Sequence, residues 1–356
     1  RYLAARGAAY LLAGFAYPRV ASEEAAMKYL LIGAFAAGFL VFGIALLYGA
    51  TGSSNLVAIG QKLAGAELLA DDRAFMLAGA ALVIIGFGYK ISMAPFHMWT
   101  PDVYEGSPTP VAAFMSVGTK GAGFAAMARL LLVALGSQYA SWVIILAILA
   151  GVTMLVGNIS AVAQTNVKRM LAYSSIGHAG YILMGVLAAG AGVGPRGIEG
   201  FLFYLLAYSL TNLGAFAVLI ALEQRGEAAW DLADFAGLWH RQPFLAVAMA
   251  LCMFSLAGVP PTAGFWGKFY VFTAAWQAGL QWLAVVGVIT SAIAAFFYLR
   301  IIVQMFMRDP VREMRPTLDR GLALGVGLAA LGVIVFGIVP TPVIDLVQQS
   351  VLALGR

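Results

Sequence analysis

Three lysines lie in stretches of sequence that are otherwise apolar and long enough to cross a lipid bilayer. They are Lys90, Lys120 and Lys268. A lysine at mid-bilayer costs roughly 2.5–3.5 kcal/mol on insertion scales, so three unpaired, lipid-facing lysines would together cost on the order of 10 kcal/mol. We therefore expect all three side chains to face the protein interior. Burial lowers the pKa of a lysine, and a lysine tuned in this way can relay protons.

A purely structural role is the alternative, in which each lysine pairs with a carboxylate or a carbonyl and fixes the position of its helix. Two of the three lysines adjoin helix-breaking prolines. Pro95 follows Lys90, and Pro260 and Pro261 precede Lys268. A broken helix persists in lipid only where protein or water satisfies the freed backbone groups, and broken spans beside charges commonly mark ion sites. The pattern favours proton transfer.

Two histidines and one charged pair are further candidates. His97 follows Lys90 by about two helical turns, and His178 lies inside an apolar run. A neutral histidine can pass a proton between its two nitrogens; the alternative is a hydrogen bond to a neighbouring carbonyl. Glu24 and Lys28 are four residues apart and share a helix face, either as part of a proton path or as a plain interface ion pair.

The segment FHMWTPDVYEGSPTP (96–110) links two of the lysine-bearing runs. It holds Asp102 and Glu105 among several prolines. Asp102 directly follows Pro101, and we expect it to cap the next turn. The sequence shows no nucleophile–base–acid set, no phosphate-binding glycine loop and no metal-ligand spacing. Cys252 is the only cysteine, which excludes a disulfide framework and a cysteine-based zinc or iron–sulfur site.

The composition is that of a membrane protein. The chain is 62% hydrophobic and 10% charged, against about 25% charged residues in soluble domains. Its net charge of +5 comes mostly from arginines at loop ends, without the basic and aromatic runs of a nucleic-acid binder. We predict an all-α, polytopic membrane helix bundle with about ten spans: 2–17, 25–49, 74–94, 109–135, 140–161, 169–190, 198–222, 244–275, 281–306 and 321–349.

Basic residues are concentrated in the loops of one side of the predicted bundle. These loops are residues 18–24, 162–168, 223–243 and 307–320. The positive-inside rule places them in the cytoplasm, and the even number of spans then places both chain ends outside.

Three segments carry a family resemblance. They are KISMAPFHMWTPDVYEGSPTPVAAFMSVGTKGAGF, NVKRMLAYSSIGHAGYILMG and SLAGVPPTAGFWGKFYVF. They strongly resemble the subunit N family of proton-pumping NADH:quinone oxidoreductase, respiratory complex I, from about Ala13 to the C-terminus. The sister subunits L and M share the lysines and the broken helices, but WTPDVYEG and GFWGKFYVF are not expected in them.

The resemblance implies an antiporter-like fold of fourteen helices, built from two inverted five-helix repeats with flanking helices. Residues 1–356 would form one transmembrane domain that lacks the first four helices. Within it, 1–135 would be the remainder of the first repeat, 136–306 the second repeat and 307–356 a C-terminal helix.

The resemblance also implies roles for the candidate residues. Lys90 and Lys268 would be the lysines of the two discontinuous helices, and Lys120 the lysine that connects them along a polar axis. The remaining candidates match a charged pair and histidines along or near that axis: Glu24, Lys28, His97 and His178.

One expected residue departs from the family pattern. The glutamate that pairs with the first lysine should fall near Leu3, in a motif resembling ELxSLP, where this chain reads RYLAARGAA. A truncated or frame-shifted N-terminus, replacement by Glu24, and weak pumping are the explanations that stay open.

The function implied is proton translocation by a non-redox subunit, driven by quinone reduction elsewhere in the complex. NAD, FMN, iron–sulfur clusters and quinone would belong to the whole complex, and no cofactor is expected in this chain. The expected partners are the bilayer of a bacterial cytoplasmic membrane and the neighbouring membrane subunits M and K. The alternatives are a subunit of an Mrp-type sodium/proton antiporter and a membrane subunit that is structural and conducts nothing.

Overall fold

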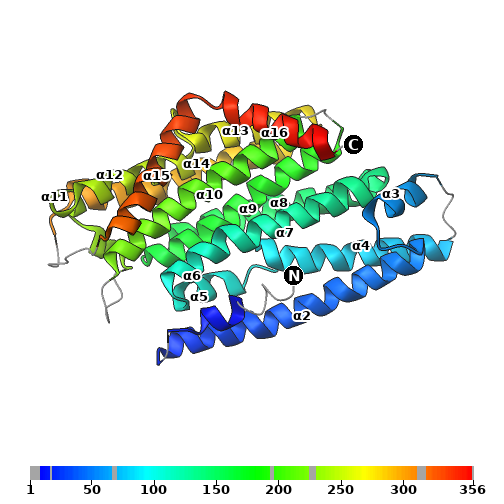
Figure 1. Cartoon of the computed structure of the whole chain (residues 1–356), viewed down its shortest axis with the longest axis horizontal. Helices are drawn as coiled ribbons and strands as arrows, with labels where there is room; N and C mark the ends of the chain where they lie inside the picture. The colour runs from blue at the N-terminus through cyan, green and yellow to red at the C-terminus, as the bar shows by residue number, and fades with distance from the viewer. Residues whose placement is uncertain are drawn as a thin grey trace.

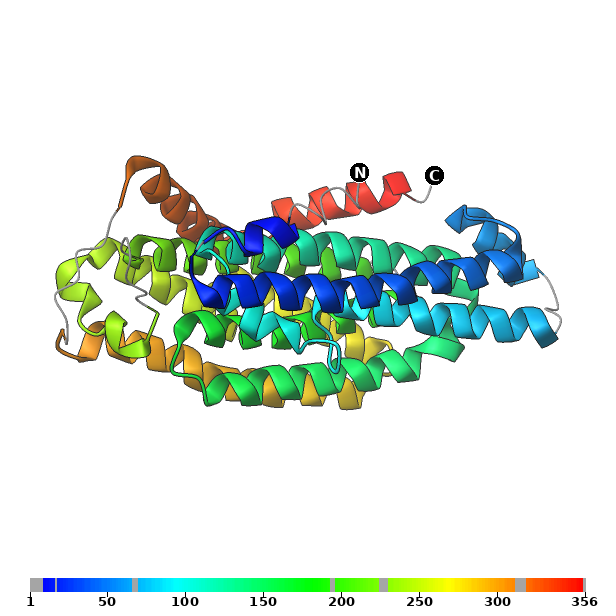
Figure 2. The ribbon, with the colours of Figure 1, turned by 90° about the horizontal axis from the view of Figure 1, so that it is seen from below.

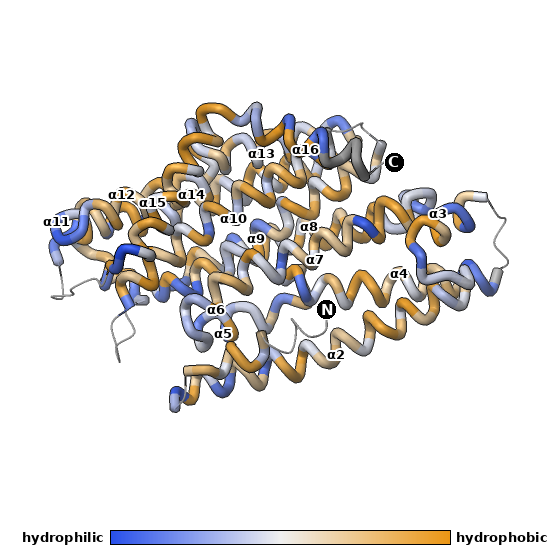
Figure 3. The backbone as a smooth tube through the Cα atoms, in the orientation of Figure 1, coloured by the Kyte–Doolittle hydropathy of each residue, from blue (hydrophilic) through white to orange (hydrophobic). Residues whose placement is uncertain are grey.

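The chain folds as a bundle of long helices that run side by side. The computed structural model describes residues 9–16, 18–65, 70–192, 196–223, 230–310 and 318–354. Figure 1 shows the helices aligned with the long axis of the molecule. Hydrophobic residues cover most of their length, and hydrophilic residues gather toward the two ends (Figure 3). This distribution is the one that a bilayer requires.

Eight helices in the described part of the chain are long and apolar enough to cross a membrane. Each coincides with a predicted span. They are α2 (Val20–Thr51), α4 (Ala70–Ile91), the segment Thr109–Ala134 that contains α6 (Thr109–Phe114) and α7 (Lys120–Arg129), α8 (Tyr139–Val162), α9 (Val167–Gly190), α10 (Arg196–Leu222), α14 (Gln281–Met307) and α15 (Arg320–Ile338).

The two predicted helix breaks are confirmed. Helix α4 ends at Ile91, and α5 (Trp99–Gly106) continues after a turn; α12 (Pro243–Ala257) is likewise followed by α13 (Ala263–Gln277). Side chains satisfy the backbone groups that the breaks free. At the first break, the N–H of Ala94 donates to Thr153 Oγ1 at 3.0 Å, and the indole of Trp99 donates to the carbonyl of Tyr89 at 3.1 Å.

The C-terminal span differs from its prediction. The sequence indicates one helix over 321–349, but α15 ends at Ile338 and a separate helix, α16 (Thr341–Leu354), follows. Pro340 lies between them, and a proline lacks the backbone donor and restricts the residue before it. The prediction of a single C-terminal helix is therefore wrong in detail.

A ten-residue helix lies where the sequence indicates only a loop. Helix α3 (Leu56–Gly65) buries Ile59 and Leu63, and it packs against the end of the Thr109–Ala134 segment. Ten residues are too few to be recognised as a span. For the predicted span 2–17, residues 9–13 are helical, and residues 1–8 lie outside the described part.

Three of the predicted basic loops meet at one end of the bundle. The N–H of Val167 donates to the carbonyl of Trp230 at 2.6 Å, and the N–H of Gly237 donates to the carbonyl of Gln304 at 3.1 Å. Figure 2 shows this end opposite the end that carries α3. We call it the basic-loop end. Helix α9 crosses the centre of the bundle and is almost completely buried.

Candidate functional site

The three lysines are buried inside the bundle. Lys90, Lys120 and Lys268 expose 3%, 2% and 5% of their surface. The prediction that they face the protein interior is confirmed, and the burial of three cationic side chains in one bundle makes this row the candidate site.

Lys90 lies one residue before the end of α4, in a cluster of tyrosines. Its ammonium group donates a hydrogen bond to the Tyr29 hydroxyl at 3.4 Å. It also lies 5.4 Å from the centre of the Tyr29 ring and 5.9 Å from those of Tyr10 and Tyr89. Aromatic faces stabilise a cation, most strongly where water is excluded.

Lys120 begins α7 directly after a five-residue π-helical segment, Met115–Thr119. Such segments are rare and are frequent at functional sites. The ammonium group of Lys120 donates to the carbonyl of Ser175 at 2.9 Å and also to the Ser175 hydroxyl. His97 lies in the turn between α4 and α5, near enough for an electrostatic interaction with Lys120.

His178, on α9, connects to a chain of hydroxyl groups. Its Nδ1 is 2.7 Å from the Tyr204 hydroxyl, and its Nε2 is 3.0 Å from the Tyr298 hydroxyl. The Tyr298 hydroxyl in turn bonds to Ser174. The structure thus gives His178 tyrosine partners instead of the carbonyl that the alternative invoked. Hydroxyl and imidazole groups both donate and accept hydrogen bonds, so this series of side chains can pass protons.

Lys268 lies on α13, close to the second helix break. Its ammonium group donates to the carbonyl of Ala257 at 2.9 Å and to the Ser291 hydroxyl at 2.6 Å. It lies 5.2 Å from the centre of the Tyr181 ring. On α9, His178 lies between Ser175, which bonds to Lys120, and Tyr181, whose ring Lys268 approaches.

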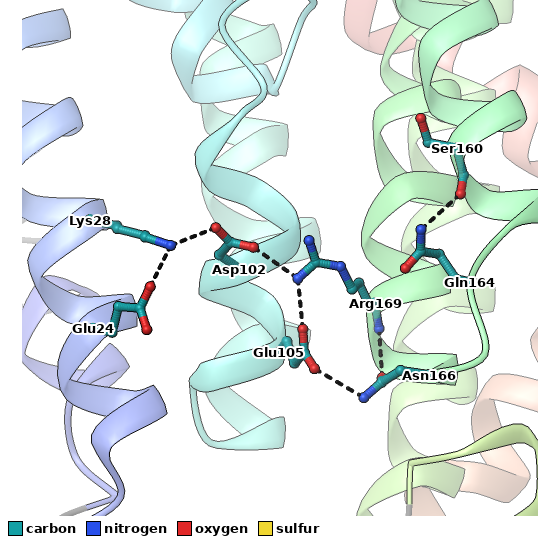
Figure 4. Close-up of polar contacts among 8 residues, drawn as sticks. All are labelled: Glu24, Lys28, Asp102, Glu105, Ser160, Gln164, Asn166 and Arg169. Atoms are coloured by element: carbon teal, nitrogen blue, oxygen red, sulfur yellow. Dashed lines mark hydrogen bonds and ion pairs between the residues drawn. The ribbon is translucent and has the colours of Figure 1, made fainter.

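A second cluster of charges lies toward the basic-loop end. Lys28 is 2.5 Å from Glu24 and 2.7 Å from Asp102. Arg169 bridges Asp102 and Glu105, with both contacts at 2.8 Å. Figure 4 shows how this ion network joins α2, α5 and α9. The Glu24–Lys28 pair is thus one part of a larger network.

Two expectations about these residues need correction or restatement. Asp102 does not cap a turn, because α5 begins three residues before it with no side-chain cap, and its two oxygens bond to Lys28 and Arg169. Glu24 is largely exposed and pairs with Lys28, so the structure gives no support to its replacing the glutamate expected near Leu3. Leu3 itself lies outside the described residues.

Sequence reasoning missed a fourth buried lysine. Lys168, which the sequence places in a basic loop, is fully buried at the start of α9. Its ammonium group donates to the carbonyl of Ser107 at 2.6 Å and lies 4.0 Å from the centre of a ring of Trp230. The sequence did hold a signal that the helix begins before Lys168: Asn166, a residue type that commonly caps helices. The structure confirms this cap, because the N–H of Arg169 donates to the Asn166 side chain at 3.0 Å.

Taken together, the site consists of three buried ammonium groups and of His178 with its tyrosine and serine hydroxyl partners. Within the described ranges, no cluster of three or more histidine, cysteine or acidic side chains could hold a metal ion. The groups present can accept and donate protons.

Comparison with known proteins matches residues 6–294 to the family model described as NADH:quinone oxidoreductase/Mrp antiporter, transmembrane. This chain belongs to that antiporter family. A relative named NADH-quinone oxidoreductase subunit N 2, from Roseiflexus castenholzii, is 67% identical over 346 residues, which are 96% of this chain and 70% of the relative. Subunit N of Chloroflexus aggregans is 63% identical over 346 residues, 97% of this chain and 70% of the relative.

A solved structure shows the same fold of the antiporter family. Respiratory complex I from Thermus thermophilus, with bound aureothin, contains a chain that superposes with a TM-score of 0.81 at 38% identity. The match covers 95% of this chain and 71% of that one. The two helix breaks, each with a buried lysine beside it, are thus part of an antiporter-like helix bundle.

Proposed function

We propose that this antiporter-family chain is the subunit N type of proton-translocating membrane subunit in an NADH:quinone oxidoreductase. The observation that carries the proposal is the burial of Lys90, Lys120 and Lys268, with His178 on α9 between the contacts of the last two. The names of the two relatives described above support the assignment to this complex.

Protons would move along the row by changes in the charge of neighbouring groups. A lysine that gains a proton disfavours the charged state of the next lysine, because like charges repel strongly where water is scarce. His178, bonded through both ring nitrogens to tyrosine hydroxyls, can take a proton on one side and release one on the other. Ser175, bonded to Lys120, lies three residues before His178 on α9 and so on the same helix face.

The driving energy would come from outside this subunit. Moving one charge against 100 mV costs about 2.3 kcal/mol. Quinone reduction elsewhere in the complex would supply this energy, and NAD, FMN, iron–sulfur clusters and quinone would be bound by other subunits. We therefore assign this chain to a translocase without a redox centre of its own.

The subunit would lie in a bacterial cytoplasmic membrane beside other membrane subunits, with subunits M and K as neighbours. The basic-loop end would face the cytoplasm by the positive-inside rule. Both chain ends would then lie on the opposite side.

Replacement of the lysines tests the proposal. We expect Lys268→Ala and Lys90→Ala each to lower NADH-driven proton pumping several-fold in membranes that hold the intact complex. Lys62→Ala is the matched control, because Lys62 is an exposed lysine on α3 that donates to the carbonyl of Thr51, so its removal should leave pumping unchanged.

Two outcomes would contradict the proposal. Unchanged pumping in both lysine variants would favour a structural subunit that conducts nothing. Sodium-dependent transport by a complex that lacks flavin and iron–sulfur subunits would favour an Mrp-type antiporter.

A further inference from the structure

A pocket opens between α10, α13 and α16, away from the basic-loop end. Its volume is about 300 Å³, and its lining includes Glu199, Tyr270, Thr273, Gln277 and Ile344. None of the three lysines lines it. The pocket therefore lies outside the row described above, on the part of α13 that follows Lys268.

Among the described residues, Glu199 is the one charged side chain in the lining of this pocket. Its Oε1 atom is buried and has no hydrogen-bond partner among the described residues. A buried polar atom without a partner is costly, by roughly 1–3 kcal/mol and more for a charged group. The Glu199 side chain also lines the pocket, and a pocket of this size accommodates several waters.

A favourable position at a helix terminus does not account for this arrangement. Glu199 lies in the first turn of α10, where a carboxylate is stabilised by the helix dipole. An exposed carboxylate would gain that stabilisation as well. The dipole therefore gives no reason for a buried oxygen without a hydrogen-bond partner.

Two packed helices connect Glu199 with the lysine row. On α13, Tyr270 lies two residues after Lys268; it packs against Gly200, next to Glu199, and lines the same pocket. On α10, Tyr204 lies five residues after Glu199, about 7.5 Å along the helix axis, and bonds to His178. The close approach of Gly267 to Tyr204 holds the two helices together at this level.

We propose that Glu199 is the proton-transfer residue that receives protons leaving the lysine row and releases them at the face opposite the basic-loop end. The ammonium group of Lys268 would lose a proton through water to the Glu199 carboxylate, which leaves a neutral amine and a carboxylic acid. The acid would then give its proton to bulk water and return to the carboxylate. This step deepens the proposed function and rests on it.

The test uses the intact complex in membrane vesicles. Glu199→Gln keeps the shape of the side chain but cannot take up a proton, so NADH-driven pumping should fall several-fold, whereas Glu199→Asp should keep at least half of it. Infrared difference spectra between the oxidised and reduced complex should show a protonated carboxyl band that the Gln variant lacks. A structural role alone would not remove that band.

Asp345→Asn is the matched control, because Asp345 is an exposed carboxylate on α16, next to the pocket residue Ile344. It should leave pumping and spectra unchanged. If Glu199→Gln leaves both unchanged while Lys268→Ala lowers pumping, the role of Glu199 is wrong and the proposed function stands. If neither variant lowers pumping, both fall.

If the Glu199→Gln complex fails to assemble, a second test uses the wild-type complex. Dicyclohexylcarbodiimide reacts with protonated carboxyl groups in apolar surroundings. In the wild-type complex it should modify Glu199 and inhibit pumping, and inhibition without an adduct at Glu199 would overturn the proposal.

Discussion

Arg169 shows how one side chain ties distant parts of the chain together. A single guanidinium nitrogen donates to Asp102 and to Glu105 at 2.8 Å each, which attaches α9 to α5. Lys28, on α2, donates a hydrogen bond to the same Asp102. Ion pairs on a surface contribute little, but this network is partly buried and its members share partners, so removal of the shared cation leaves two carboxylates facing each other.

We expect Arg169→Met to destabilise the folded subunit by about 1–2 kcal/mol, less than the 3–5 kcal/mol of a fully buried pair because the network is partly exposed. The measurement is the thermal unfolding of the purified complex, followed by the loss of this subunit. Arg169→Lys should recover part of the loss, because it keeps a positive charge. Arg308→Met is the control, because Arg308 is an exposed arginine near the same end. An equal loss of stability in the Arg169→Met and Arg308→Met variants would show that the network contributes nothing specific.

At the scale of elements, the second helix break is held together by close backbone packing. The N–H of Gly264 donates to the Ser255 hydroxyl at 3.1 Å. A Cβ at Gly264 would lie 1.9 Å from the carbonyl oxygen of Ser255. The start of α13 can therefore approach α12 only with glycine at this position, and this approach brings Lys268 to the carbonyl of Ala257.

Gly264→Ala should push the two half-helices apart and destabilise the subunit by about 1–3 kcal/mol, the usual cost of overpacking. It should also lower pumping, because Lys268 would lose its place at the break. Gly325→Ala is the control: a Cβ there meets nothing within 4 Å, and alanine favours a helix over glycine by about 1 kcal/mol. Thermal unfolding and pumping would be measured together, and a Gly264→Ala variant as stable and active as the control would refute the argument.

At the scale of the whole molecule, the distribution of loops predicts an orientation. The basic loops meet at one end, and α3 lies at the other (Figure 2). Cys252 is the only cysteine and is buried. Single cysteines introduced at exposed loop positions can therefore be labelled without interference.

Asp309→Cys should react with a membrane-impermeant maleimide only from the cytoplasmic side, and Ser54→Cys only from the opposite side. Both residues are exposed, Asp309 toward the basic-loop end and Ser54 between α2 and α3. Labelling of right-side-out and inside-out vesicles separates the two. Reaction of both cysteines from one side would contradict the proposed topology.

The sequence by itself determined the membrane class, most of the spans, the two breaks and the burial of Lys90, Lys120 and Lys268. Runs of about 20 apolar residues, prolines within them and the high cost of a charge in lipid are local properties, and each can be recognised without knowing what packs against what. Pro340 was equally visible, yet its effect on the last span was missed because the apolar run continues on both sides of it.

Only the tertiary structure decided which groups meet. Asp102 was expected to cap a turn, and its partners Lys28 and Arg169 lie 74 and 67 residues away along the chain. Lys168 lies in a stretch of sequence that predicts a loop, but it is buried against Trp230. Glu199 was not recognised as a candidate because its pocket is formed by three helices. Helical periodicity fixes neighbours three or four residues apart, whereas contacts between helices depend on how the whole bundle packs.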